Sequence, residues 1–429
     1  MVGKSLRDHL FEIDGSKDWV VYHKDEHIDF ELTFIKGFKK PCRLTFSFPI
    51  VLSRVVGRAV KSFFGGKINY YSPVHIRNIG WHENDILEGG YWIGETSDIV
   101  VEISETAFYI FVRIYFDAMK YEPPQLRSLF TKSVQRAAEG IIVEVASDYE
   151  MEFDDEDEES LWAESQMSTP QMSRLAVPDI SLDEFISFYP PETKMALERI
   201  RNMIDKITEK KRKNLHFSAL LAGTPGTGKS LFCALMANYA AERKALVVYL
   251  SAHNLADYIL ETIKMFPCVL FIVDECEPAL LNRETSSGKS PVAQIMHLLD
   301  GYYLSTSSSS WGLLMTTNRP HVIDPALLRP LRIDEVVEFT PLDDESLAES
   351  VFLFWCKKLG VTLPNDWDRK ILKGKTHAEC AALANKIYRM QEFGKEVDME
   401  TIRALVKSVS SWRKPQRLKS QVEEERVGF

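Results

Sequence analysis

The chain has 429 residues, 45% of them hydrophobic and 27% charged, which is the composition of an ordinary globular protein with room for two or three domains. A formal net charge of −10 argues against a protein built to coat nucleic acid, although a local basic pore stays compatible with it. No secretory signal opens the chain, and its longest apolar stretch, AFYIFVRIYF, is too short to span a bilayer. The six cysteines show neither C-x-x-C pairing nor metal-ligand spacing, so we expect a cytoplasmic chain without a membrane span.

The first part of the chain has the pattern of an α+β domain. Apolar and polar residues alternate over Ile28–Ile35, and KGFKKP then turns the chain into CRLTFSFPI, which predicts a hairpin. Further on, DIVVEIS and FYIFVRIYF flank a short turn and predict a second hairpin. We expect residues 1–146 to form a domain that binds a substrate or partner.

Two helices are predicted in the same region. Leu52–Phe63 carries apolar residues on one face, and Arg54, Arg58 and Lys61 lie on another. A solvated surface and a binding patch are both compatible with that basic face. The second helix is predicted to begin at Pro123 and to end at Gly140.

The stretch DYEMEFDDEDEE begins an acidic segment that repels itself and is unlike packed structure. It predicts a solvated linker, with a docking segment for a basic partner as the alternative. After it, DISLDEFISFYPPETKMALERIRNMI predicts one amphipathic lead-in helix. The expected division is an acidic linker over 147–176, a large α/β subdomain over 177–340, a helical lid over 341–412 and a charged tail over 413–429.

The stretch HFSALLAGTPGTGKSLF contains the phosphate-loop pattern G-x-x-x-x-G-K-[ST], with a strand pattern before it and a helix pattern after it. Glycines let backbone N–H groups surround phosphate oxygens, and the positive end of the following helix dipole attracts the same charge. We expect Lys229 to reach the β- and γ-phosphates of ATP and the Ser230 hydroxyl to coordinate Mg²⁺. The loop residues expected to bind the nucleotide are Gly223, Thr224, Pro225, Gly226, Thr227, Gly228, Lys229, Ser230 and Leu231.

Polar residues also end two further strand-like runs. The apolar run CVLFIVDEC ends in Asp274 and Glu275. Asp274 is expected to bind the nucleotide's Mg²⁺, and Glu275 to orient and deprotonate the attacking water. The run WGLLMTTN ends in Asn318, whose amide suits a hydrogen bond to that water or to the γ-phosphate. A turn former before Arg319 is the alternative role of Asn318.

Three stretches, DECEPALLNRE, IMHLLDGYY and LLMTTNRPHVIDPALLRPLRID, resemble the classical AAA branch of the AAA+ ATPases over about Asp179 to Trp412. The resemblance implies a P-loop AAA+ ATPase core, a parallel sheet sandwiched by helices, with a small helical lid and the α+β domain before it. It also implies a homo-hexameric ring with ATP between neighbours. Arg329 and Arg332 match the arginine fingers that reach into the adjacent site, and Asp300–Tyr302 matches the intersubunit signalling motif.

The chain also departs from the family pattern. Leu331 stands where the family usually has glycine, so the turn between the two arginines is expected to differ. Tyr258 is the aromatic residue near the position of the family's pore loop, with a place in a helix core as the alternative. The short segment around it resembles that of the mitochondrial inner-membrane translocase of folded Rieske protein, whose membrane anchor we do not expect here.

The lid is expected to begin with a helix capped by Asp343 or Asp344 and ending at Gly360. The stretch GKTHAECAALANKI occupies the place of the family's Gly-Ala-Asp segment beside the adenine, with His377 at the glycine position. Phe188 and Tyr189 are candidates for covering the other adenine face, and core positions are the alternative for both.

These observations favour a Mg²⁺-dependent ATPase ring that remodels, disassembles or translocates a protein selected by its N-terminal domain. A nucleic-acid motor or loader is the main alternative, which the acidic composition disfavours. A scaffold with a silent nucleotide site conflicts with the presence of Glu275, Asn318 and both arginines. A fused metalloprotease is disfavoured because HENDI at His82 lacks the second histidine of the zinc motif.

Overall fold

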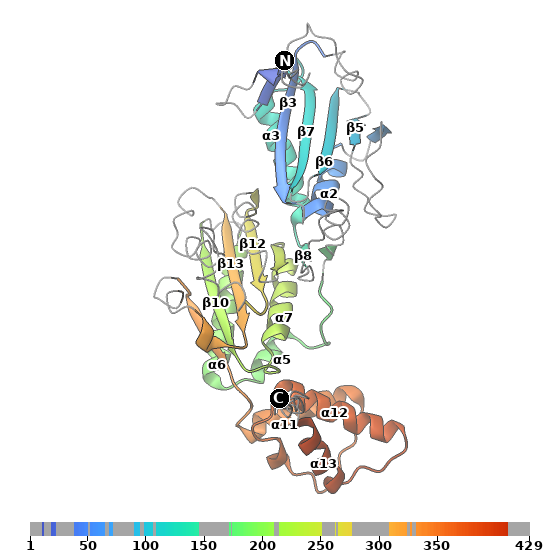
Figure 1. Cartoon of the computed structure of the whole chain (residues 1–429), viewed down its shortest axis with the longest axis vertical. Coiled ribbons are helices and arrows are strands. Elements are labelled where there is room, and N and C mark those ends of the chain that lie inside the picture. The colour runs from blue at the N-terminus through green and yellow to red at the C-terminus, as the bar shows by residue number, and fades with distance from the viewer. Residues whose placement is uncertain are drawn as a thin grey trace, which may run out of the picture.

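The structure is a computed structural model of the chain (Figure 1). The residues that it describes are 11–12, 19–22, 38–49, 52–64, 68–71, 90–94, 98–105, 109–145, 171–172, 174–209, 214–250, 262, 265–276, 309–323, 327 and 332–410. Several predicted features lie outside them: the strand Ile28–Ile35, His82, the acidic stretch, Tyr258 and the tail 413–429.

The N-terminal part contains an antiparallel sheet with the strand order β1-β2-β3-β7-β6-β5-β4. The second predicted hairpin is confirmed, because β6 and β7 pair antiparallel from Ile99↔Phe116 onward. The strand β3 pairs with β2 on one side and β7 on the other. The bounds are β1 Phe11–Glu12, β2 Trp19–Tyr22, β3 Pro41–Pro49, β4 Ile68–Tyr71, β5 Gly90–Gly94, β6 Ile99–Glu105 and β7 Tyr109–Asp117.

Both predicted N-terminal helices are confirmed. The helix α2 (Ser53–Phe63) buries its apolar face, and Val55, Val56 and Ala59 are 0% exposed. The helix α3 (Pro123–Ala138) begins at the predicted proline. Gly140 follows its end with φ +74°, a conformation that glycine adopts without a steric penalty. Figure 1 shows both helices beside the β3–β7–β6 part of the sheet.

The second sheet has the strand order β14-β10-β13-β12-β11-β8-β9. All pairs are parallel except β8 with β9, which confirms the predicted parallel α/β core. Its strands are nearly continuous apolar runs, as a sheet covered on both faces requires. The bounds are β8 Ile142–Val145, β9 Gln171–Met172, β10 His216–Gly223, β11 Leu246–Leu250, β12 Cys268–Val273, β13 Ser310–Thr317 and β14 Glu335–Phe339.

The strand β8 joins this sheet although it lies within the stretch predicted as the N-terminal domain. Val247 pairs with Ile142, and the Val247 N–H donates to the carbonyl of Ile141 at 2.9 Å. The apolar side chains of α2 and α3 form one continuous core with one face of the parallel sheet. Gln135 of α3 also donates from Nε2 to the carbonyl of Met265 at 3.0 Å, just before β12. The parallel sheet therefore crosses the predicted boundary at residue 146.

The predicted lead-in helix is two helices, so that prediction is wrong in this detail. The helix α5 is Leu182–Ser187 and α6 is Pro191–Thr208. Pro190 lies between them with ψ 155°, outside the helical region. A residue that precedes a proline is disfavoured in the α-helical region, and Pro191 suits the first turn of the second helix. The Pro-Pro pair therefore ends one helix and begins the next.

The lid follows β14 and lies at the opposite end of the molecule from the N-terminal sheet (Figure 1). It contains α11 Glu345–Leu359, the 3₁₀ helix η6 Arg369–Leu372, α12 His377–Glu392 and α13 Met399–Ser410. The predicted cap of α11 is confirmed, with Asp344 accepting from the Ser346 N–H at 2.7 Å. Gly360 ends the helix at φ +73°. In the described segments, no helix combines the length and apolar character that crossing a bilayer requires.

Candidate nucleotide site

The phosphate loop connects β10 to α7 (Lys229–Glu242). Gly228 immediately precedes α7 at φ +101°, in the left-handed region. A Cβ atom on Gly228 would lie 2.2 Å from the hydroxyl of Tyr189, so a larger residue does not fit there. Tyr189 in turn donates a hydrogen bond to the carbonyl of Thr227 at 2.8 Å, which holds the loop against the core.

Lys229 is buried at the beginning of α7, with only 5% of its surface exposed. Its Nζ donates to the carbonyls of Gly223 and Thr224 at 2.8 and 2.9 Å. The ammonium therefore lies across the opening of the loop, where two backbone dipoles fix it. A buried cation beside backbone N–H groups makes a site for an anion such as phosphate.

Ser230 and Asp274 meet at the carboxyl ends of the strands. The Ser230 Oγ donates to Asp274 Oδ1 at 3.1 Å, and Thr316 Oγ1 donates to the same oxygen at 2.5 Å. Tyr249 donates to the other carboxylate oxygen at 3.3 Å. A hydroxyl and an oriented carboxylate are the hard oxygen ligands that Mg²⁺ prefers. The donor set therefore fits a magnesium ion that also binds phosphate oxygens.

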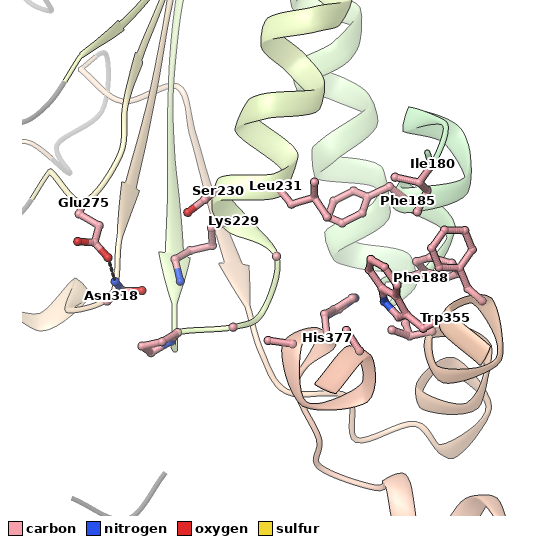
Figure 2. A pocket seen from close by; sticks show the side chains of 17 residues that line it. Ile180, Phe185, Phe188, Lys229, Ser230, Leu231, Glu275, Asn318, Trp355 and His377 are labelled. Carbon is pink, nitrogen blue, oxygen red and sulfur yellow. Dashed lines mark hydrogen bonds between the residues drawn. The ribbon is translucent and has the colours of Figure 1, made fainter. Parts of the chain in front are cut away.

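Glu275 and Asn318 form the next pair along the same edge of the sheet. Asn318 Nδ2 donates to Glu275 Oε1 at 3.0 Å (Figure 2). The Glu275 N–H donates to Thr316 Oγ1 at 2.9 Å, and its φ is +50°, which is uncommon for a residue with a side chain. Strained backbone of this kind persists where surrounding contacts fix it, and functional sites are where it concentrates.

A cavity of about 290 Å³ runs from these residues to the lid. Lys229, Ser230, Glu275 and Asn318 line one end of it. Figure 2 shows the other end between α5 and the lid helices, where aromatic side chains gather. The aromatic residues that line this end are Phe185, Phe188, Phe354, Trp355 and His377. The cavity thus has a charged end and a flat apolar end, as a nucleotide does.

The two aromatic residues predicted for the adenine face differ in position. Phe188 lines the cavity, whereas Tyr189 does not; it is 3% exposed and packs behind the wall. For Tyr189 the core position, which was the alternative, is therefore the one that the structure has, and its hydroxyl is directed to the phosphate loop. Sequence reasoning missed Phe185, Phe354 and Trp355. Phe185 lies three residues before Phe188, one helical turn away, and that spacing was the available signal.

The lid touches the phosphate loop directly. The Ala378 N–H donates to the carbonyl of Gly226 at 2.9 Å. This contact occurs at the beginning of α12, which Thr376 and Glu379 cap reciprocally: the Glu379 N–H donates to Thr376 Oγ1, and the Thr376 N–H to Glu379 Oε2. The lid position is therefore coupled to the loop that holds the phosphates.

The matches to the arginine fingers lie mostly outside the described residues. Arg329, Leu331 and Asp300–Tyr302 are not among them. Arg332 is described, and its backbone carbonyl accepts from the Ser218 hydroxyl at 2.7 Å. Arg332 is not among the residues that line the cavity of its own chain. Its guanidinium role remains a prediction.

Comparisons with known proteins agree on the core. The profile of the family described as "ATPase family associated with various cellular activities (AAA)" matches residues 219–341. Protein SAV of Sulfolobus acidocaldarius is 31% identical over 205 residues, covering 43% of this chain and 26% of that protein. The 26S proteasome regulatory subunit 4 homolog of Dictyostelium discoideum is 28% identical, covering 33% and 35%. The ATP-dependent zinc metalloprotease FtsH of Buchnera aphidicola is 28% identical, covering 45% and 34%.

The family match is confined to residues 219–341. The chain spans between about a quarter and a third of the length of these three relatives. The matched segment contains the phosphate loop, the Asp274-Glu275 pair and Asn318. Residues 219–341 thus match the AAA family, and the parallel sheet to which they contribute agrees with that match.

Proposed function

We propose that the chain hydrolyses ATP to ADP and phosphate with the help of Mg²⁺. One observation supports this most strongly: Lys229, Ser230 and the Glu275–Asn318 pair line a single cavity, and Ser230 is hydrogen-bonded to Asp274. An anion site, a magnesium site and a carboxylate for the water are the parts that phosphoryl transfer to water requires.

We assign the binding of the ATP phosphates to the phosphate loop. Its backbone N–H groups and the Lys229 ammonium hold the β- and γ-phosphates, and the positive end of α7 adds to the attraction. Ser230 and Asp274 would hold the magnesium ion. When bound, that ion neutralises charge on the phosphate oxygens. The aromatic end of the cavity takes the base, and it is lined by Phe185, Phe188 and the lid residues Phe354 and Trp355.

Glu275 is proposed as the base that orients and deprotonates the attacking water. Its carboxylate accepts a hydrogen bond from Asn318, which limits the directions in which it can turn. Asn318 is therefore proposed to position Glu275 and to contact the water or the γ-phosphate with its amide. Glu275 also lines the cavity in which the phosphates are proposed to bind.

We further propose a homo-hexameric cytoplasmic ring in which Arg329 and Arg332 of one subunit act on the ATP of the next. The relatives' names support action on proteins, since one is a proteasome regulatory subunit and another is an ATP-dependent protease. Residues 1–146 apart from β8 are proposed to select the protein substrate, and 147–176 apart from β9 to act as a linker. Residues 177–340 and 341–412 are proposed as ATPase core and lid, and 413–429 as a tail.

A phosphate-release assay tests this function. The chain should hydrolyse ATP with Mg²⁺, stop with EDTA, and stop when Lys229→Ala removes the buried ammonium. Absence of hydrolysis in the assembled wild-type protein would contradict the proposal. Stimulation by DNA or RNA that weakens steeply with salt would favour a nucleic-acid motor instead. Stimulation by an unfolded protein supports remodelling.

A further inference from the structure

His377 occupies an unusual position for a polar side chain. It is the first residue of α12, lines the cavity, and is 8% exposed. Among the described residues, neither Nδ1 nor Nε2 has a hydrogen-bond partner, although both atoms are buried. A buried polar atom without a partner costs stability, so native proteins retain one where it serves a purpose.

The ring is held in one orientation by its neighbours. It stacks on Tyr189 with the ring centroids 4.6 Å apart and the planes 23° apart. Phe185 flanks it at 6.3 Å. The Tyr189 hydroxyl donates to Thr227 in the phosphate loop, so the ring rests on a side chain that is itself fixed to the loop. His377 therefore lies at the aromatic end of the cavity, away from Lys229 and Ser230 (Figure 2).

The imidazole suits one part of a nucleotide. Burial lowers the pKa of His377 from 6.5 to about 4, so the ring is neutral near pH 7 and offers one N–H donor and one acceptor nitrogen. A phosphate would prefer a cation, whereas the edge of a purine base presents both acceptors and amino donors. The aromatic walls beside His377 match the flat faces of such a base.

We infer that His377 is a base-recognition residue, which forms a hydrogen bond with the purine base of the bound nucleotide. This inference rests on the proposed binding of ATP and adds the group that reads its base. It gives the buried nitrogens the partner that the described residues do not supply. Because Ala378, the next residue, bonds to Gly226, base contact and phosphate-loop contact occur at the same end of α12.

The test compares two ligands on the full chain carrying Glu275→Gln, so that ATP is not consumed. The ligands are Mg-ATP and Mg-tripolyphosphate, which has the phosphates without the base. His377→Phe keeps a stacking ring and removes both nitrogens. We expect the Kd for ATP to rise about five- to tenfold, as loss of one hydrogen bond predicts, with the Kd for tripolyphosphate changed less than about twofold.

The matched control is His216→Phe. His216 also stacks on an aromatic side chain, Trp311, at 5.5 Å, but it begins β10 at the end of the strand remote from the phosphate loop. This variant should bind both ligands as the parent does. His377→Leu repeats the comparison with a smaller apolar side chain, in case the phenyl ring does not fit.

The outcomes separate the two proposals. Equal affinity of the parent and His377→Phe for ATP overturns the inference and leaves the ATPase assignment intact. Equal weakening of ATP and tripolyphosphate also overturns it, because the residue then acts on the whole loop. A parent chain that binds neither ligand overturns the ATPase assignment and the inference with it.

Discussion

Asn318 donates a hydrogen bond to Glu275 across the ends of two adjacent strands, with Asn318 Nδ2 3.0 Å from Glu275 Oε1. The strands β12 and β13 are in parallel register from Cys268↔Ser310 to Val273↔Met315, which brings both residues to the same edge. Asn318 thereby orients the carboxylate of a residue that lies 43 positions earlier in the chain. The direction of the proposed base is thus set by a neighbour in the sheet.

Glu275→Gln should retain ATP binding and reduce turnover at least about 100-fold. Glutamine keeps the size of the side chain and an oxygen that accepts from Asn318, but it takes no proton from water. Binding is measured by titration calorimetry and turnover by phosphate release. Asp274→Asn serves as the comparison, since it should lower the affinity for Mg²⁺ as well as the turnover. Turnover within about threefold of wild type in Glu275→Gln would show that another group is the base.

Asn318→Ala should lower turnover about 10- to 100-fold while the Kd for ATP changes less than about twofold. Alanine removes the donor that orients Glu275 but leaves the phosphate loop untouched. Asn365→Ala is the matched control, because Asn365 is exposed in the lid and distant in sequence from the strands. Similar losses in both variants, or none in Asn318→Ala, would contradict the positioning role.

Local patterns in the sequence predicted most of the machinery. The phosphate loop, the acidic pair and Asn318 each follow a strand-like run, and parallel strands bring their carboxyl ends to one edge. The caps at Asp344 and Gly360 were predictable too, because their signals are contained within a few residues. The sequence was therefore sufficient to predict that the phosphate loop, the acidic pair and Asn318 lie close together.

The features that were missed depend on long-range contacts. The apolar pattern of the four residues of β8 is compatible with either sheet. Their pairing with Val247 and its neighbours places β8 in the parallel sheet. Phe354 and Trp355 belong to α11 and reach the cavity because the lid folds back on the loop. For Tyr189 the sequence left a core position and an adenine contact open, and the packing of its ring in the core, with only its hydroxyl at the loop, decides between them. Periodicity within an element carries none of this information.

Gly228→Ala should abolish nucleotide binding and destabilise the fold by about 2–3 kcal/mol. Its φ of +101° strains a residue with a side chain, and the new Cβ would meet the Tyr189 hydroxyl at 2.2 Å. Gly360→Ala is the control: its φ is +73° and no atom lies within 4 Å of the new Cβ. That variant should lose about 1 kcal/mol, from strain alone, and keep its affinity for ATP. Denaturant unfolding and ATP titration measure both quantities, and equal effects at the two glycines would contradict the packing argument.

Two inactive variants should restore activity when they share a ring. Lys229→Ala subunits lack the phosphate-loop ammonium, and Arg329→Ala subunits lack the proposed finger, so each alone should hydrolyse little ATP. In mixed rings, an Arg329→Ala subunit beside a Lys229→Ala subunit has its own loop and its neighbour's arginine. An equal mixture, denatured and refolded together, should recover activity at about a quarter of its sites if assignment is random. No recovery, or wild-type activity of Arg329→Ala alone, would contradict action in trans.

The stability of the protein should depend on His377 below pH 6.5. Its pKa is about 4 in the folded chain and 6.5 when the side chain is unperturbed, and burial is the cause. The unfolded chain therefore takes up this proton first as the pH falls. The stability that a neutral His377 contributes is complete above pH 6.5 and is lost progressively down to about pH 4. Burial raises the pKa of the stacked Tyr189 well above its usual value, so that hydroxyl stays neutral throughout the range.

Between pH 7.5 and pH 5.0 the linkage amounts to about 2 kcal/mol for His377 alone. Carboxylates also lower the stability on acidification, but they do so equally in a variant that keeps them. The free energy of unfolding should therefore fall about 2 kcal/mol less between these pH values in His377→Phe than in wild type, as measured by urea unfolding at each pH. An equal fall in the two proteins would mean that His377 titrates normally in the folded state, and hence that its ring is in contact with water. His321→Phe, at an exposed histidine, is the control, and its free energy of unfolding should fall between these pH values by as much as that of wild type.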